Sequence, residues 1–134
     1  MATAATFVWL GMVLAISVLE APLKFRAPGV TTVIGLGIGR LVFRALNLAE
    51  VVLALVVVIA LVLAGLPVGP GVVVGVLVVL LLAQLVLVRP RLNRRSDRVL
   101  AGETLPRSRL HLAYIGLEVV KVVALVVLGV LLLA

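Results

Sequence analysis

Charged side chains are absent from three long stretches of this chain. No Asp, Glu, Lys or Arg occurs in residues 2–19, 51–88 or 122–134. A helix that crosses the ~30 Å hydrocarbon core of a bilayer needs about 20 mostly apolar residues, whereas the core of a soluble domain needs no charge-free run of this length. The pattern therefore predicts an integral membrane protein made of α-helices.

Proline and glycine divide the apolar sequence into four spans within a single domain, residues 1–134. Breaks are expected where proline disfavours helix at the residue before it and where glycine and proline cluster, namely at Pro22, Pro28, residues 66–71 and Pro90. The predicted helices cover about residues 3–20, 36–65, 72–88 and 109–133. The predicted fold class is all-α, an integral membrane four-helix bundle.

The basic residues predict how the spans are oriented. All 12 Lys and Arg fall between Lys24 and Lys121, and all but Lys121 lie in two clusters, at residues 24–44 and 89–109. Cationic segments resist translocation and are attracted to the anionic lipids of the inner leaflet. We therefore expect an N-out/C-out protein of the cytoplasmic (inner) membrane, with both termini outside.

Two interpretations remain open for the arginine-rich segment between the third and fourth spans. Its apolar residues Leu92, Val99 and Leu100 alternate with charged ones, which is typical of a short interfacial helix lying among the lipid headgroups. The alternative is a solvated loop that only anchors the topology. Contacts with anionic lipids are expected from the following basic side chains: Arg40, Arg44, Arg94, Arg95 and Arg98.

Composition argues against several functional classes. Hydrophobic residues make up 65% of the chain, against ~45–50% in soluble proteins. The net charge of +7 does not indicate nucleic-acid binding, because the cations flank apolar spans and only 4% of residues are aromatic. With no Cys and one His, the chain has too few soft ligands for a zinc or copper site. We predict no metal, no cofactor and, since Ser17 and Ser108 have no evident catalytic base, no enzyme activity.

Polar residues inside the fourth span are the strongest functional signal. His111, Tyr114, Glu118 and Lys121 are spaced by three or four residues, which places them on one helix face. Lys121 lies ~16 Å along the axis from Leu110. An ionised side chain at that depth costs at least ~2.5–3.5 kcal/mol. We therefore expect Lys121 to face protein and to pair with Glu118.

The other spans contribute matching polar residues: Ser17 and Glu20 from the first, Arg40, Arg44, Asn47 and Glu50 from the second, and Gln84 from the third. We expect a buried polar cluster in the cytoplasmic half of the bundle. The three glutamates would be neutralised by Arg40, Arg44, Lys121 and His111. Two interpretations remain open: interhelical pairs that fix the packing at ~0.6–2 kcal/mol each, or a path for protons, ions or a polar substrate, with His111 as a proton relay.

The glycine-rich segment Gly35-Leu-Gly-Ile-Gly39-Arg40 does not fit a dinucleotide-binding loop. That pattern requires its third glycine where Arg40 stands. The segment predicts instead a helix start at the membrane surface, either holding a lipid phosphate or serving as a flexible helix entry. The spacing of Gly35 and Gly39, repeated in Gly71 and Gly75, also favours close helix packing.

Short motifs of the chain resemble a known family: Phe7-Val-Trp-Leu-Gly11, Glu20-Ala-Pro22-Leu-Lys-Phe25, Gly39-Arg-Leu-Val-Phe43-Arg44 and Ser108-Arg-Leu-His111-Leu-Ala-Tyr114. The chain resembles the small four-helix integral membrane proteins of a domain-of-unknown-function family distantly similar to copper-resistance D proteins. The resemblance implies a four-span bundle, often tied to metal or stress tolerance, with no established chemistry. The chain lacks the Met and His clusters of a copper transporter, which argues against that activity.

Two functional hypotheses follow from the sequence. The favoured one is a small non-enzymatic multi-pass membrane protein, acting as an accessory or scaffold subunit or as an oligomeric permeability factor built around the Glu118–Lys121 pair. The alternative is a proton-coupled small transporter or channel that uses Glu118, Lys121, Glu50 and His111. Expected partners are lipids with anionic headgroups at the cytoplasmic face, and a homo-oligomer or a larger membrane complex.

Overall fold

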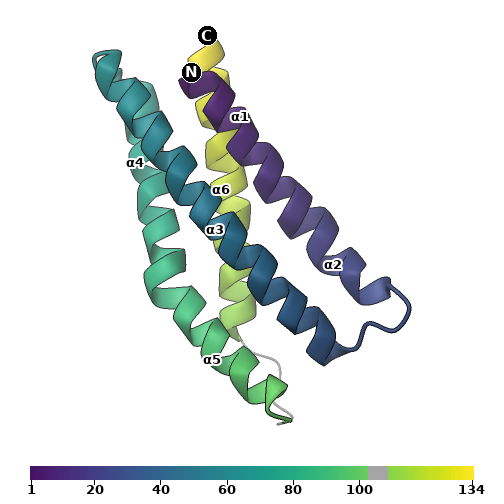
Figure 1. Ribbon diagram of the computed structural model, residues 1–134. Coiled ribbons are helices and arrows are strands. Elements are labelled where there is room, and N and C mark those ends of the chain that lie inside the picture. Colours follow the sequence, from purple (N-terminus) through teal and green to yellow (C-terminus); the bar gives the residue numbers. More distant parts are fainter. Residues whose placement is uncertain (103–108) are drawn as a thin grey trace.

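A computed structural model describes the backbone of residues 1–102 and 109–134, and the side chains of these residues except 109–111. All regular secondary structure in this part of the chain is helical. Four helices are long and apolar enough to cross a membrane, at Ala2–Arg26, Thr32–Leu63, Val68–Leu100 and Leu112–Leu133 (Figure 1). The predicted all-α chain with four apolar helices of membrane-spanning length is confirmed.

The first span continues through a proline. It comprises α1 (Ala2–Val13), a π-helical segment η1 (Leu14–Glu20), α2 (Ala21–Leu23) and a 3-10 turn η2 (Lys24–Arg26). The predicted end at Glu20 is wrong, because the wider π turn accommodates Pro22. The Ala21 N–H donates to the carbonyl of Ile16, five residues back, so the turn directly before Pro22 is wider than an α-helical turn.

The second span is one long helix, α3 (Thr32–Leu63). It begins earlier than the predicted residue 36 because the Thr31 hydroxyl caps it, accepting a hydrogen bond from the Ile34 N–H at 3.2 Å. It ends before the predicted residue 65, since Gly65 has a left-handed φ of 87°. The Leu66 N–H then donates back to the Leu61 carbonyl at 2.8 Å, which satisfies a helix-end carbonyl.

The third span also continues past a proline. It comprises α4 (Val68–Ala83), the π-helical η3 (Gln84–Val88) and α5 (Arg89–Leu100). The predicted start at residue 72, the predicted end at residue 88 and the separate interfacial helix are therefore wrong. The Arg89 N–H donates to the Gln84 carbonyl, again five residues back, and Pro90 falls in the first turn of α5, where a missing N–H is tolerated. The third span therefore continues as a helix through the arginines up to Arg98.

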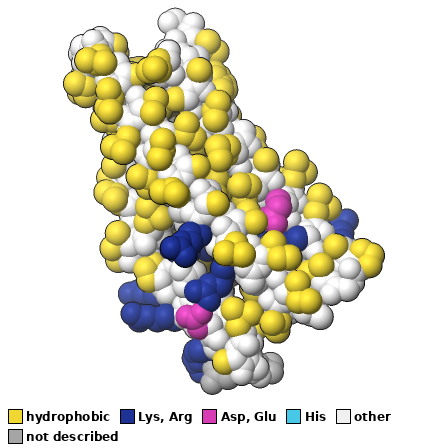
Figure 2. All heavy atoms as spheres, in the orientation of Figure 1, with side chains coloured by type: hydrophobic (Ala, Val, Ile, Leu, Met, Phe, Trp, Pro, Cys, Tyr) yellow, Lys and Arg dark blue, Asp and Glu magenta, His cyan; other side chains and the backbone are white. Residues whose placement is uncertain are grey.

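The fourth span, α6 (Arg109–Leu133), has its predicted bounds. α1 packs against α3 and α6, and α4 packs against the same two helices. Both chain termini lie at the same end of the molecule as the turn between α3 and α4 (Figure 1). We call this the charge-free end and the opposite one, where α5 lies, the basic end. Figure 2 shows Lys and Arg gathered in the half toward the basic end, below an apolar surface.

The apolar core fills the half of the molecule toward the charge-free end. Each span contributes a large side chain that is at most 1% exposed: Trp9, Val57, Leu77 and Leu125. Glycines allow the closest approaches. A Cβ at Gly129 would lie 2.7 Å from the Phe7 ring, and a Cβ at Gly35 would overlap the Phe25 ring. Gly39 likewise faces the Lys24 side chain, whereas Gly75 meets open space.

Candidate functional site

A buried polar cluster draws side chains from all four spans: Ser17, Glu50, Gln84, Glu118 and Lys121. On each helix these residues lie about one turn from the nearest residue of the apolar core. They share its face because inward-facing positions recur every three or four residues. Counting ~1.5 Å per residue, Lys121 is ~18 Å from the C-terminal end of α6, near the middle of a ~30 Å hydrocarbon layer. The cluster is where the chain places charge deepest.

The Lys121 ammonium is the centre of the cluster. Its Nζ lies 3.0 and 2.7 Å from the two carboxylate oxygens of Glu50, 2.8 Å from Oε1 of Gln84 and 2.6 Å from Oε1 of Glu118. Lys121 and Glu50 are both 0% exposed. An ammonium has three N–H donors, so four oxygens at these distances engage all of them. The buried cation is thus fully compensated inside the protein, as burial of a charge requires.

The Glu50 and Glu118 carboxylates differ in the donors from which they accept hydrogen bonds. Glu118 accepts a second hydrogen bond at Oε1 from the Gln84 amide nitrogen at 2.7 Å, and one at Oε2 from the Ser17 hydroxyl at 3.0 Å. Gln84 therefore connects the ammonium to Glu118, accepting from one and donating to the other. Glu50 instead accepts from the Lys121 ammonium at both of its oxygens. Loss of the ammonium consequently affects Glu50 most.

Some residues expected in the cluster lie outside its hydrogen-bond network. Asn47 and Tyr114 are buried nearby, at 8% and 6% exposure. Glu20 is partly exposed and its nearest cation is Lys24, 3.7 Å away. The placement of Glu20 with Glu50 and Glu118 is therefore wrong: η1 carries it beyond Ser17, toward the basic end.

The basic residues of the second span do not neutralise the glutamates as expected. Arg40 forms an ion pair with Asp97 of α5, and Arg44 is exposed. The physical reason is depth, because Arg40 lies ~15 Å from Glu50 along the helix axis, whereas Lys121 lies directly opposite. His111 belongs to α6, but its side chain is outside the described residues, so its expected role stays a prediction. Ser108 is likewise outside the described residues.

The expected lipid-binding arginines lie on two helices. Besides Arg40 and Arg44 on α3, the helix α5 carries Arg94, Arg95 and Arg98. Arg94 and Arg98 are exposed and Arg95 is half-buried. All of them lie at the basic end, outside the buried cluster.

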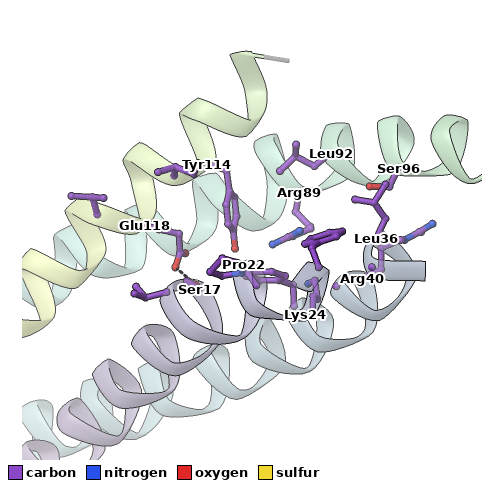
Figure 3. A pocket seen from close by; sticks show the side chains of 18 of the residues that line it. Ser17, Pro22, Lys24, Leu36, Arg40, Arg89, Leu92, Ser96, Tyr114 and Glu118 are labelled. Carbon is purple, nitrogen blue, oxygen red and sulfur yellow. Dashed lines mark hydrogen bonds between the residues drawn. The ribbon is translucent and has the colours of Figure 1, made fainter. Parts of the chain in front are cut away.

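A cavity of about 630 Å³ lies between the polar cluster and the basic end. It is bounded by the first span from Leu14 to Phe25, by the first turns of α3, by α5 and by α6. Figure 3 shows Ser17, Glu118, Tyr114 and Arg89 reaching into it from three of these walls. Glu118 and Ser17 form its deepest polar surface, so the buried cluster borders this cavity directly.

Arg89 was missed in the sequence because it was assigned to the end of a span. Its guanidinium lies 4.6 Å from the ring centroid of Tyr114 and 4.9 Å from that of Phe43. These are cation–π distances, and the two rings meet edge to face at 5.9 Å. The sequence does contain a signal for this site: Arg89 follows a long apolar run directly, in a chain with few aromatic residues.

Among the side chains that the structure describes, those of residues 1–102 and 112–134, no three Asp or Glu are grouped so as to hold a metal ion. Comparisons with protein-family models, curated proteins and solved structures find no match for this chain. The resemblance of its short motifs to a domain-of-unknown-function family stays a prediction.

Proposed function

We propose that this chain is a small non-enzymatic multi-pass membrane protein that acts as an accessory or scaffold subunit. In this role the buried polar cluster holds the four helices in one arrangement, and the outer faces of the helices are available to a partner in the membrane. The proposal also places the chain in the cytoplasmic membrane with its basic end inside, following the distribution of its arginines.

One observation carries this proposal: the cluster takes at least one side chain from each span and satisfies its own charge. The Lys121 ammonium, Glu50 and Gln84 are almost completely inaccessible, at 0%, 0% and 2% exposure. Apolar helices in lipid have no hydrophobic driving force that fixes their rotation, so polar contacts between helices set which faces meet. A network of this kind supports a structural role, because its groups already have their partners within the chain.

The apolar core also bears on the alternative of a permeability factor. Between the cluster and the charge-free end, the interior is occupied by packed side chains such as Trp9, Val57 and Leu125. Water or ions do not pass through a dry, close-packed core of this kind. A permeability factor built from this chain would therefore need a path between several copies.

Native mass spectrometry after extraction of the membrane with an amphipathic polymer tests the scaffold proposal. We expect a complex of defined mass and stoichiometry that contains this chain. The folded double variant Lys121→Met with Glu50→Gln serves as control, since it replaces this one ion pair with neutral groups and should keep the complex. Recovery of a lone single chain from native membranes at native expression would contradict the proposal.

A second candidate, a proton-coupled transporter, is favoured by the position of Glu118. This carboxylate borders the cavity on the basic side and is 2.6 Å from the Lys121 ammonium. A proton reaching it from the cavity would weaken that contact, as carrier mechanisms with intramembrane carboxylates require.

Proteoliposomes containing a pH-sensitive dye test the transport hypothesis. Under the transport hypothesis, wild type moves protons, Glu118→Gln does not, and Glu20→Gln, a carboxylate outside the cluster, behaves as wild type. Wild-type vesicles as tight as empty ones would exclude it.

A further inference from the structure

We propose that the cavity at the basic end binds one anionic membrane lipid. The phosphate of the lipid lies against the Arg89 guanidinium, and an acyl chain lies between the first span and α6. This inference goes beyond the scaffold role, because it assigns a ligand and a binding site that hold whether or not the chain has a protein partner.

Arg89 has hydrogen-bonding capacity that the described residues do not use. Its Nε and one of its terminal nitrogens are buried and have no hydrogen-bond partner there. Its contacts are with the faces of two aromatic rings, which leave the N–H groups along the edge of the guanidinium unpaired. A buried donor without an acceptor is unfavourable, and more so when the donor is charged. A phosphate accepts two such N–H groups side by side.

The other charged groups of the cavity already have partners. Lys24 faces Glu20 at 3.7 Å, and Arg40 pairs with Asp97. Glu118, the carboxylate at the deep end, is 2.6 Å from the Lys121 ammonium. Among the described residues that line the cavity, Arg89 is the cation that lacks a carboxylate, so an anion is drawn to it.

Tyr114 adds a second unpaired group beside Arg89. Its side chain is 6% exposed, and its hydroxyl oxygen is buried without a hydrogen-bond partner in the described structure. Figure 3 shows the ring pointing from α6 into the cavity, toward the side where Arg89 lies. A phenol donates to a phosphate oxygen readily. The guanidinium and the hydroxyl together form a two-residue anion site.

The apolar wall of the same cavity identifies the anion as a lipid. Val18, Val119 and Val123 line the cavity and are also 58%, 57% and 56% exposed at its side. They belong to membrane-spanning helices, so the face they expose meets acyl chains. α1 packs along α6, but α2 diverges from it toward the basic end (Figure 1). A free phosphate would gain nothing from this opening, whereas a lipid chain fills it with apolar contact.

Native mass spectrometry of the purified protein with defined lipids tests the proposal. The protein is stripped of lipid in mild detergent and then given phosphatidylglycerol or phosphatidylcholine with identical acyl chains. We expect one tightly retained phosphatidylglycerol per chain. Arg89→Gln should weaken its retention about tenfold, the loss of roughly one charge-assisted contact. Arg91→Gln, an exposed arginine on the same helix and outside the cavity, is the matched control and should bind as wild type.

A second pair of variants tests the acyl-chain site independently of Arg89. Val119→Trp fills the opening and should reduce phosphatidylglycerol binding, whereas Val120→Trp, on a lipid-facing position outside the cavity, should not. If Arg89→Gln fails to fold, this pair of variants still tests the lipid-binding proposal. Equal retention of the two lipids, or equal binding by Val119→Trp and Val120→Trp, would overturn the proposal. So would full displacement of the lipid by millimolar inorganic phosphate, which would make the free anion the ligand.

Discussion

Replacement of Lys121 by Met is expected to be the most damaging single change in the polar cluster. The ammonium lies within 3.0 Å of four oxygens, three of them from the Glu50 and Glu118 carboxylates. Met keeps the length of the side chain but leaves both carboxylates buried without a cation. Removing one partner of a buried ion pair costs about 3–5 kcal/mol. We expect a loss near 3 kcal/mol, because Glu118 keeps its hydrogen bonds from Gln84 and Ser17.

A second substitution should restore part of the loss, and by an amount that depends on which carboxylate it removes. Glu50→Gln removes the carboxylate that accepts from the ammonium at both of its oxygens. Together with Lys121→Met it should recover about 2 kcal/mol relative to the sum of the single changes, a coupling typical of residues in contact. Glu118→Gln should recover less with Lys121→Met, since Glu118 has two other donors. In both pairs the double variant should be more stable than Lys121→Met alone.

The measurement is the free energy of unfolding in detergent micelles, titrated with sodium dodecyl sulfate and followed by far-ultraviolet circular dichroism. The control cycle combines Lys121→Met with Arg91→Gln, an exposed and distant change, and its effects should add. Strict additivity in the Glu50 and Glu118 cycles as well would refute the assignment of Lys121 as the shared partner of both carboxylates.

Three further predictions concern helix packing and orientation. Ser17→Ala removes one hydrogen bond to the cluster and should lower the free energy of unfolding by about 0.6–1 kcal/mol in the same titration. Gly35→Ala places a methyl group where an aromatic ring already lies and should cost about 1–3 kcal/mol; Gly37→Ala, which meets open space, should not lower the melting temperature, and equal effects of the two would contradict the packing. Because the chain has no cysteine, a membrane-impermeant maleimide applied to intact cells should label Val68→Cys, while Arg94→Cys should react only after lysis; the reverse pattern would invert the proposed topology.

The four spans are readable from the sequence because each is a property of neighbouring residues. Stretches such as residues 51–88 lack any charge. Apolar runs of that length are what helices that span a bilayer need. Likewise, Glu118 and Lys121 are three residues apart on one helix, so their contact is set by helical periodicity alone. Local signals also have limits. Pro22 and Pro90 look like helix ends, yet π-helical turns before them let both helices continue.

The partners of the buried charge could not be read in this way. Glu50 and Gln84 are 71 and 37 residues from Lys121. Whether they reach it depends on the rotation and depth of three separate helices. The same uncertainty explains why Arg40 was expected to neutralise a glutamate, and why Arg89 was not expected to matter.

By itself, the sequence determined that this chain lies in a membrane, that it has four apolar helices and that few polar residues enter the spans. Those properties follow from hydropathy and helical periodicity, which act between residues close together in the chain. The tertiary structure decided which of these polar residues meet. Ser17, Glu50 and Gln84 converge on the fourth span, and α2 and α6 diverge to leave a cavity beside Arg89, because helix packing sets rotation and depth across distances that no local pattern encodes.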